Sequence, residues 1–417
     1  MRVQKAEPLV GFLRAKPLNM AKPLNTAKPL NTGEVSLKVF IISRGYPSDK
    51  YVTNGIFEFD QAKALAEAGH QVVFLAVDLR SIRRKRKFGR ESFEKNGVFV
   101  EAINVPCGKI PQGLLRAVRK TALKKLYKSC EKKYGKPDII HSHFLEISYT
   151  AAQVLSGKNI PIVMTEHLSA LNNKVISQKL IDTGKNTYRF YDRVITVGEN
   201  LAKSLEKNFG VSSVIIPNVA DTEAFSLNLD NKKTDEGSVN NLRIISVGSL
   251  IKRKNMDLLI KAFARLHSIK PASYLDIYGK GVEKENLQEL ISSKGLKDFA
   301  VLHGAKSRKE IAEKMAEADF FALASSVETF GVVYIEALSA GLPVVAAISG
   351  GPENFVDESN GILVEADNED KFFEALLKMS ESCGGYDRKA ISENIADTYS
   401  PGAVAEKLTA LYKELCE

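Results

Sequence analysis

The sequence predicts an α/β fold with two domains, each built on a parallel sheet that helices cover on both faces. Three observations carry this prediction. A strand, a loop, a helix and a strand follow one another between Leu37 and Val77, and a new strand, LRIISVGSL, starts the series again at Leu242. The stretch Asp319–Ala346 repeats the pattern. A chain of 417 residues is long enough for two or three domains that each bury an adequate core.

Residues 1–36 contain a six-residue repeat, with the copies AKPLNM, AKPLNT and AKPLNT starting at Ala15, Ala21 and Ala27. Each copy holds a proline, which denies its neighbours a helix or a central strand. The three leucines are too few to form a core. We therefore expect residues 1–36 to be a disordered leader.

The first ordered unit runs from the apolar strand LKVFIIS through a loop with Gly45 and Gly55 into a helix-period run, FEFDQAKALAEAG, and the strand QVVFLAV. These lengths indicate a right-handed crossover between parallel strands. Gly55 lies at the junction of loop and helix, where a glycine lets the backbone approach a phosphate. The alternative is that Gly55 only turns the chain.

The charges are distributed unevenly along the chain. Residues 1–220 hold 36 Lys and Arg against 18 Asp and Glu, a net charge of +18, whereas residues 221–417 carry a net charge of −9. Seven of the cations lie in the eleven residues Arg80–Arg90. A basic half of this kind suits an anionic membrane surface, a phosphorylated acceptor or nucleic acid.

The segment Leu114–Tyr134 has the pattern of an amphipathic basic helix. The expected apolar stripe consists of Leu115, Val118, Ala122, Leu126 and Cys130. The expected polar face carries the cations Arg116, Arg119, Lys120, Lys124 and Lys128. Together with Arg80–Arg90, this helix is a candidate contact with an anionic membrane surface. The alternative is a solvated helix whose apolar stripe packs on its own sheet.

Two histidines follow predicted strands in the first half. His143 ends the strand of PDIIHSH, and Glu166 and His167 end the strand of PIVMTEH. Ligands bind at the carboxyl ends of strands in α/β sheets, so both histidines are candidate ligand contacts. The alternative is that each histidine is structural.

The second domain begins with a strand that ends at Gly248, followed by Ser249 and the cations Lys252, Arg253 and Lys254. A glycine at a strand end followed by cations suits a leaving diphosphate, whose charge grows as its bond breaks. Three adjacent cations are also common on an ordinary surface. Further along, a strand runs into a turn with Gly279 and Gly281.

The stretch Asp319–Ala346 brings two carboxylates close to one turn. A short apolar strand breaks at Ser325, Glu328 lies in the turn that ends at Gly331, and Glu336 lies about two turns into the following helix. The N-terminus of that helix favours anions. A phosphate cradle beside two hydroxyl acceptors suits a nucleotide sugar, although two glutamates near a helix are also commonly just solvated.

The run ETFGVVYIEALSAGLPVV resembles the donor-site signature of the retaining glycosyltransferases of family 4, which have the GT-B fold of two Rossmann-like domains facing a cleft. The resemblance extends from about Leu37 to the C-terminus. It implies an N-terminal acceptor domain over residues 37–218 and a donor domain over residues 219–400. It also implies that a helix over residues 401–417 crosses back to the first domain.

The resemblance also implies roles for individual residues. It makes His143, Lys254 and Glu328 catalytic and puts His143 and His167 on the acceptor side. The implied donor-binding residues are Gly55, Gly248, Ser249, Arg253, Lys254, Gly279, Gly281, Glu328, Phe330, Gly331, Val332, Val333 and Glu336. Within this set Glu336 would bind ribose hydroxyls, and Glu328 hydroxyls of the transferred sugar.

The chain departs from the family pattern at three places. Asn54 stands where many members have a first glycine before Gly55. Ser249 replaces a phosphate-binding arginine, a loss that Lys252 or Arg253 could compensate. The link between the domains reads Asn218-Val219-Ala220-Asp221 instead of Asn-Gly-Val-Asp.

The implied activity is transfer of a hexosyl unit, with retention, from a nucleotide-diphosphate sugar to a hydroxyl of a glycan, lipid-linked or small-molecule acceptor, as in polysaccharide biosynthesis. Two alternatives are a non-hydrolysing sugar-nucleotide epimerase and a catalytically silent sugar-nucleotide binding protein. The chain contains no Asp-x-Asp, so a metal bound by that motif is not supported. We expect no cofactor, no metal and no nucleic-acid partner. No signal peptide, membrane span or C-x-x-C pair is found in the sequence, which indicates a cytoplasmic protein, with a peripheral place on the inner face of the membrane as a candidate.

Overall fold

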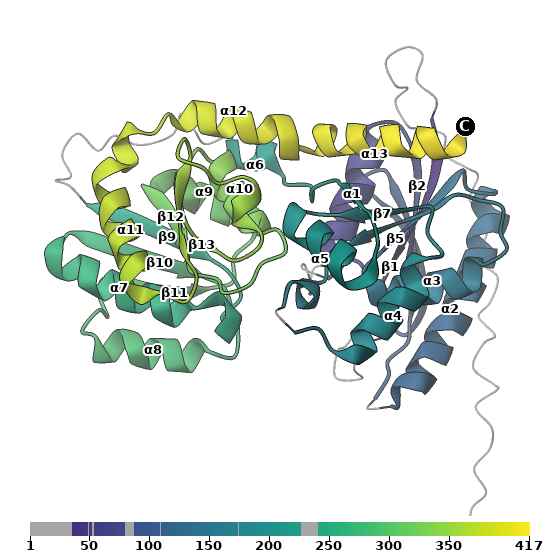
Figure 1. Cartoon of the computed structure of the whole chain (residues 1–417), viewed down its shortest axis with the longest axis horizontal. Coiled ribbons are helices and arrows are strands. Elements are labelled where there is room, and N and C mark those ends of the chain that lie inside the picture. Colours follow the sequence, from purple (N-terminus) through teal and green to yellow (C-terminus); the bar gives the residue numbers. More distant parts are fainter. Residues whose placement is uncertain are drawn as a thin grey trace, which may run out of the picture.

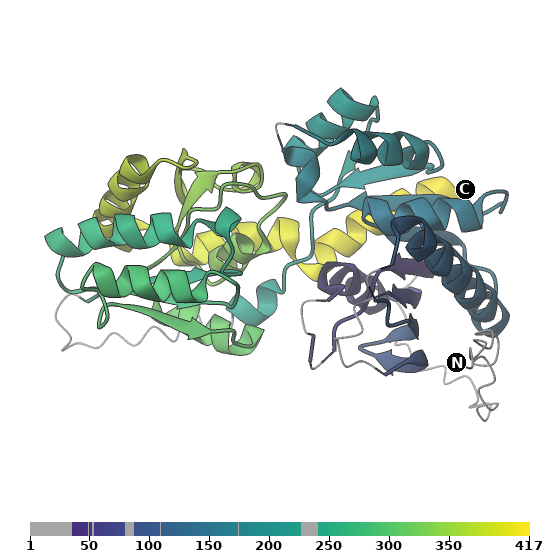
Figure 2. The same cartoon turned by 90° about the horizontal axis from the view of Figure 1, so that it is seen from below.

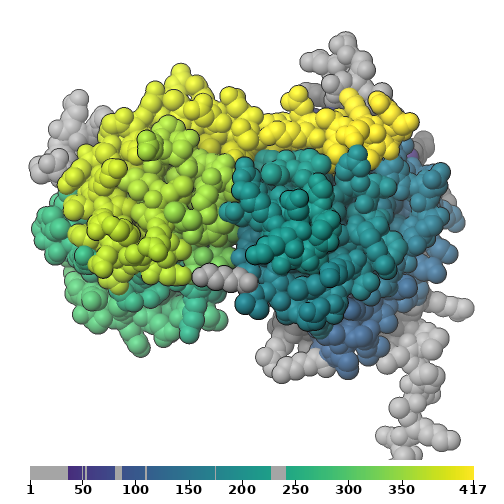
Figure 3. Space-filling view, in the orientation of Figure 1, coloured from purple at the N-terminus to yellow at the C-terminus, as the bar shows by residue number. Residues whose placement is uncertain are grey.

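The computed structural model describes residues 36–48, 50–51, 54–79, 87–108, 110–173, 175–226 and 241–417. Almost all of the expected leader, residues 80–86 of the basic run, and residues 227–240 between the two sheets lie outside these ranges. The described residues form two α/β domains that lie side by side (Figure 1). In the space-filling view the two lobes meet, and the C-terminal segment spans them along one edge (Figure 3).

The first domain alternates strands and helices. Its elements are β1 (Lys38–Ser43), α1 (Ile56–Glu67), β2 (Gln71–Asp78), β3 (Gly89–Lys95), β4 (Val98–Asn104), α2 (Gln112–Tyr134), β5 (Ile139–His143), α3 (Leu145–Leu155), β6 (Ile162–Glu166), the 3-10 helix η1 (Ser169–Asn172), α4 (Gln178–Tyr188), β7 (Arg193–Thr196), α5 (Glu199–Phe209) and β8 (Val214–Ile215). The strand order in its sheet is β3-β4-β2-β1-β5-β6-β7-β8. The strand order reverses between β1 and β5, so the loops after these two strands border the crevice where such sheets bind ligands.

One edge of this sheet differs from the predicted parallel arrangement. β3 pairs antiparallel with β4, and the two strands are joined by Asn96 and Gly97, both with positive φ. An Asn-Gly pair is the preferred two-residue turn of a β-hairpin because both positions need φ above zero. The predicted parallel sheet therefore carries one antiparallel strand at this edge, which the sequence analysis did not find although the Asn-Gly pair is a signal for a hairpin.

The second domain follows the short helix α6 (Thr222–Ser226). Its elements are β9 (Leu242–Val247), η3 (Lys252–Lys254), α7 (Met256–Ile269), β10 (Ser273–Tyr278), α8 (Lys284–Ser293), β11 (Ala300–Gly304), α9 (Arg308–Glu317), β12 (Phe320–Leu323), α10 (Val332–Ser339), β13 (Val344–Ile348), η4 (Pro352–Asn354), β14 (Gly361–Glu365), α11 (Glu369–Ser382), η5 (Cys383–Gly385) and α12 (Arg388–Tyr399). All its strand pairings are parallel, in the order β11-β10-β9-β12-β13-β14.

The last helix, α13 (Pro401–Cys416), lies on the first domain although it follows the second in the chain (Figures 1 and 2). Its apolar side shares a core with α1 and one face of the first sheet. Two buried hydrogen bonds join it to that domain: Tyr412 Oη lies 2.6 Å from His141 Nδ1, and Thr409 Oγ1 lies 2.8 Å from His70 Nε2. The chain therefore crosses between the domains twice.

Replacing Tyr412 with phenylalanine is expected to lower the free energy of unfolding by about 1–3 kcal/mol, because it leaves the buried His141 Nδ1 without its partner. Urea unfolding followed by circular dichroism measures the change. Tyr274→Phe is the matched control, because Tyr274 is half-buried in strand β10. An equal effect of the two substitutions would contradict a specific role for the Tyr412 hydroxyl.

Helix α2 packs its apolar side against the opposite face of the first sheet, where Ala122, Leu126 and Cys130 share a core with β1 and β2. The expected polar face needs one correction. Arg119 is buried and pairs with Glu146 of α3 at 2.9 Å, so it is not available to a partner surface. A buried arginine is tolerated here because a carboxylate neutralises it.

Candidate functional site

Lys254 and Glu328 meet where the strand order of the second sheet reverses. Lys254 ends η3 in the loop after β9, and Glu328 lies in the loop after β12. Their side chains form an ion pair between Nζ and Oε1 and are 12% and 9% exposed. Because both are largely shielded from water, their attraction is stronger than that of a surface pair. The structure thus brings two of the three expected catalytic residues into contact.

Backbone hydrogen bonds join the Glu328 loop to the Lys254 loop and to the loop after β13. Ser326 N donates to Arg253 O at 2.9 Å, and Glu328 N donates to Ser349 O at 2.8 Å. The carboxylate of Glu328 is therefore positioned by its main chain as well as by Lys254. A rigid support of this kind is what a binding or catalytic side chain needs.

The predicted glycines of the second domain allow close packing of backbone on backbone. A Cβ on Gly279 would lie 1.8 Å from Gly248 O, and one on Gly281 would lie 2.0 Å from Leu250 O. Gly248 N and Leu250 N in turn donate to Tyr278 O and Lys280 O. These contacts explain why the loop after β10 needs glycines. Ser249, which lies between Gly248 and Leu250, is exposed.

Helix α10 starts beside Glu328. Gly331 is its N-cap, with φ of 88°, and the N–H groups of Val332 and Val333 follow at a helix start that favours anions. The side chain of Phe330 is 2% exposed and packs against Phe355 and Tyr399. A donor could therefore contact Phe330 only through its backbone.

Glu336, one and a half turns into α10, pairs with an arginine that the sequence did not single out. Its Oε1 lies 3.4 Å from Nε of Arg308, the first residue of α9. The Nη2 of the same arginine lies 3.0 Å from Oδ2 of Asp60 in α1 of the first domain. One guanidinium thus joins carboxylates of the two domains.

Burial dominates the protonation of these carboxylates. It raises the pKa of Glu336 to about 7, with Arg308 opposing the rise and Asp60 and Asp221 adding to it. Burial also raises the pKa of Asp60, and Arg308 again opposes it. Burial is thus the main reason why Glu336 takes up a proton near neutral pH, and the negative charges of Asp60 and Asp221 add to it.

In the first domain, Gly55 is the N-cap of α1 with φ of 68°. A Cβ on Gly55 would lie 2.3 Å from Gly45 O, so only glycine fits this turn. Asn54, which stands where the family often has a glycine, is buried and donates from Nδ2 to Tyr46 O at 3.3 Å. The helix start at Gly55 is thereby held against the loop after β1.

The expected acceptor-side histidines lie together at the carboxyl ends of β5 and β6. His143 Nδ1 lies 3.1 Å from His167 Nε2, and His141 stacks on His143 with ring centroids 4.2 Å apart. Burial lowers the pKa of His141 and His167 to about 3 and that of His143 well below its ordinary range. All three are therefore neutral at pH 7.

His143 is fully buried, and its Nε2 has no hydrogen-bond partner among the described residues. Contact between this nitrogen and a ligand requires the side chains that cover it to move. Glu166 shapes the turn that carries His167: its Oε1 accepts from His167 N and Leu168 N, both at 3.0 Å, and its Oε2 accepts from Tyr188 Oη at 3.1 Å. Glu166 therefore fixes the backbone at His167, one of the three clustered histidines.

The first domain contacts the Lys254 and Glu328 loops of the second domain through η1. Ser169 Oγ accepts from Arg253 Nη1 at 2.9 Å, and Asn172 Nδ2 donates to Glu328 O at 3.2 Å. The side chain of Arg253, which is expected to bind donor phosphate, thus forms a hydrogen bond across the domain boundary. Asn172 supports the backbone of Glu328 from the opposite domain.

Two family models match the chain. The model described as Glycosyltransferase Family 4 matches residues 59–224, and the model described as Glycosyl transferases group 1 matches residues 230–398. Together they cover both domains.

The chain belongs to the group 1 glycosyltransferases of family 4.

Named relatives of this family-4 chain act on lipid-linked and small-molecule acceptors. It is 34% identical over 223 residues to the N-acetylgalactosamine-N,N'-diacetylbacillosaminyl-diphospho-undecaprenol 4-alpha-N-acetylgalactosaminyltransferase of Campylobacter jejuni, covering 52% of this chain and 57% of that protein. It is 25% identical over 337 residues to the D-inositol 3-phosphate glycosyltransferase of Paenarthrobacter aurescens, covering 76% and 81%. With several of its curated relatives, the chain aligns over about half of their length or less.

Solved structures share the whole two-domain arrangement. Sucrose-phosphate synthase from Thermosynechococcus elongatus has a TM-score of 0.73 and 20% identity, over 91% of this chain and 99% of that one. HepE of Anabaena, in complex with UDP, has a TM-score of 0.69 and 18% identity, over 91% and 100%. These likenesses show that the family-4 chain has the GT-B fold.

Sequence reasoning missed the bridge from Arg308 to Asp60 and Glu336, although one signal for it was visible. Asp60 follows Gly55 by five residues in GIFEFD, and Glu336 follows Gly331 by five in GVVYIE. The two helices of this family-4 chain thus begin alike. Nothing local indicated that both acids share one arginine.

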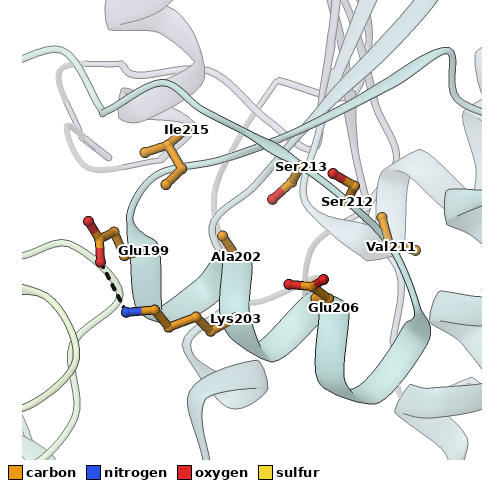
Figure 4. Close-up of a pocket in the computed structure, with 8 residues that line it drawn as sticks. All are labelled: Glu199, Ala202, Lys203, Glu206, Val211, Ser212, Ser213 and Ile215. Atoms are coloured by element: carbon orange, nitrogen blue, oxygen red, sulfur yellow. Dashed lines mark hydrogen bonds and ion pairs between the residues drawn. The ribbon is translucent and has the colours of Figure 1, made fainter.

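A pocket elsewhere in the first domain contains none of the predicted site residues. It lies between α5 and the segment leading into β8, and Lys203 and Glu199 form an ion pair at its rim (Figure 4). Within the described ranges, no three His, Cys, Asp or Glu side chains are grouped as metal ligands. No helix of the described residues is both long and apolar enough to cross a bilayer.

Proposed function

We propose that the protein is a retaining glycosyltransferase that moves a hexosyl unit from a nucleotide-diphosphate sugar to an acceptor hydroxyl. The observation that carries this proposal is the shielded Lys254–Glu328 pair beside the start of α10, at the crevice of the second sheet. The family match and the glycosyltransferase names of its relatives support it.

In the proposed complex the donor diphosphate lies against Lys254 and the N–H groups of Val332 and Val333. Lysine supplies the positive charge that the leaving phosphate needs, so no metal is required. Glu336 accepts hydrogen bonds from the ribose hydroxyls, and Glu328 from hydroxyls of the transferred sugar. Gly55 lets the first domain approach the diphosphate from the opposite side of the cleft.

The proposed reaction is a front-face substitution. The bond between the sugar C1 and the phosphate oxygen breaks while a bond from the acceptor oxygen to C1 forms on the same face. The acceptor proton passes to the leaving phosphate oxygen, so the products are the glycoside and a nucleoside diphosphate. His143 and His167 lie on the acceptor side, where their low pKa keeps them neutral hydrogen-bonding groups.

The test is acceptor-dependent release of nucleoside diphosphate. Donors should include UDP-N-acetylglucosamine and GDP-mannose, which names of relatives mention, and acceptors should include polyprenyl-diphosphate sugars and inositol phosphate. Conversion of a nucleotide sugar without any acceptor would identify an epimerase. Donor binding with no turnover on any acceptor would favour a silent binding protein. The named relatives favour neither alternative.

We also propose that α2 binds an anionic membrane surface. Lys120, Lys124 and Lys128 are exposed on α2, and Leu114 at its start is 55% exposed. Each cation near an anionic leaflet contributes about 1 kcal/mol. A peripheral position there would suit a lipid-linked acceptor of the kind named for the Campylobacter relative.

Replacing Lys120 and Lys124 with glutamate is expected to abolish co-sedimentation with vesicles that contain phosphatidylglycerol at low salt. The same double change at Lys294 and Lys297, both exposed around the end of α8, should leave it intact. Equal recovery of the wild-type protein with neutral and anionic vesicles would count against the membrane proposal.

A further inference from the structure

Arg308 is placed to connect the expected ribose-binding carboxylate with the other domain. Its Nε lies 3.4 Å from Glu336 Oε1, and its Nη2 lies 3.0 Å from Asp60 Oδ2. The side chains of Glu336 and Asp60 are only 12% and 13% exposed. The arginine therefore satisfies two shielded carboxylates that belong to different domains, which its planar fork of donors allows.

The two helices that Arg308 joins begin in the same way. Each begins after a left-handed glycine, Gly55 for α1 and Gly331 for α10, and carries its acid five residues later. A bridge between these acids therefore sets how far apart the two helix starts can lie. These starts are the two places where we expect the donor diphosphate to contact backbone N–H groups.

The charges around Glu336 come from three other elements. Arg308 of α9 favours its ionised form, whereas Asp60 of α1 and Asp221, in the link before α6, oppose it. Ribose hydroxyls donate to a carboxylate better than to a carboxylic acid, because both oxygens of the carboxylate are acceptors. Loss of Arg308 should thus move Glu336 towards its protonated form, and loss of Asp60 towards its ionised form.

We propose that Arg308 is a positioning residue that holds the Glu336 carboxylate in place for the ribose of the donor and, through Asp60, joins this contact to the first domain. The inference rests on the proposed function for the identity of the ligand. It assigns to Arg308 and Asp60 a part in donor binding that they play through the Glu336 carboxylate. Donor binding and closure of the cleft are then coupled through one side chain.

The first experiment needs no ligand. The titration of Glu336 is followed by carbon-13 NMR of labelled glutamate carboxyls in the full-length protein, with the signal assigned by its loss in Glu336→Gln. The midpoint should rise in Arg308→Gln and fall in Asp60→Asn. Lys309→Gln, which removes the next cation on the exposed side of α9, should leave it unchanged. A mere packing role would move neither midpoint, and unmoved or reversed midpoints would overturn the proposal.

The second experiment measures binding of UDP and GDP by calorimetry between pH 6 and 9. Wild-type affinity should fall as the pH drops through about 7, where Glu336 gains its proton. Arg308→Gln should bind about tenfold more weakly at pH 7.5, the effect of one lost supporting contact, and should lose affinity at a higher pH than wild type. Asp60→Asn should keep its affinity to a lower pH.

Arg308→Lys is a second variant that keeps the test valid if Arg308→Gln misfolds. It keeps the positive charge but cannot contact both acids in the same way. Arg308→Lys should bring the titration midpoint of Glu336 back towards the wild-type value. It should restore the closure of the domains less fully. Closure is measured by small-angle X-ray scattering, as the change in the radius of gyration when UDP is added. Full restoration of both would overturn the bridging role. If neither nucleotide binds to wild type while the midpoints shift as expected, the proposed function fails and the electrostatic bridge stands.

Discussion

Replacing Lys254 with alanine is expected to lower the rate of sugar transfer by about 100-fold or more, the effect of removing one preorganised group that stabilises charge in the transition state. Lys254 is largely shielded and faces the expected diphosphate site beside α10. The developing charge of the leaving phosphate would then have no cation in contact. The substitution also leaves the negative charge of Glu328 without its partner. This unpaired charge repels the anionic donor.

Steady-state and single-turnover rates with saturating donor separate binding from chemistry. Lys261→Ala, in the exposed i,i+4 pair with Asp257 on α7, is the matched control and should keep wild-type rates. A double change of Lys254 and Glu328 tells whether the pair acts as a unit, because its cost should then be less than the sum of the single changes. Turnover of Lys254→Ala within a few-fold of wild type would remove Lys254 from the proposed role.

Gly279→Ala is expected to produce the largest loss of stability, about 3 kcal/mol or more. Gly279 has a φ of 152°, and a Cβ there would lie 1.8 Å from Gly248 O. Backbone in an unfavourable region and overpacking each cost about 1–3 kcal/mol. The opposing group is a main-chain carbonyl in the Lys254 loop, so relief of the clash must move that loop.

Urea unfolding measures the loss, and calorimetry with UDP measures the expected weakening of donor binding. Gly384→Ala is the control, because a Cβ at Gly384 meets no atom within 4 Å. Gly281→Ala, with its Cβ 2.0 Å from Leu250 O, should behave like Gly279→Ala. Unchanged stability of both variants would show that the two loops can separate without cost.

Most of the second domain could be predicted from local sequence patterns. The stretch Asp319–Ala346 folds as strand, turn, helix and strand, with β12, α10 and β13 in the expected order. Gly341 follows α10 with φ of 70°, as a C′ glycine before proline should. Such features are short-range, because apolar period and glycine conformation act within a few residues.

One hairpin was missed, and one side chain does not lie where the local pattern puts it. The hairpin of β3 and β4 was missed because its solvent-facing strand Gly89–Lys95 is mostly polar and exposed, so no apolar run marked it. Arg119 was expected on the polar face of α2 because helix period alone puts it there. Its burial depends on Glu146, a residue of α3 that packs alongside.

The sequence by itself determined the α/β class, the glycine turns at the starts of α1 and α10, and the family through the run from Glu328 to Val345. Only the tertiary structure decided which of these units face one another. Lys254 and Glu328 lie 74 residues apart, and Asp60 and Arg308 lie 248 apart. Pairings at such separations depend on the strand order and on the approach of the two domains, which local periodicity does not encode. For that reason Arg308 was found only in the folded chain.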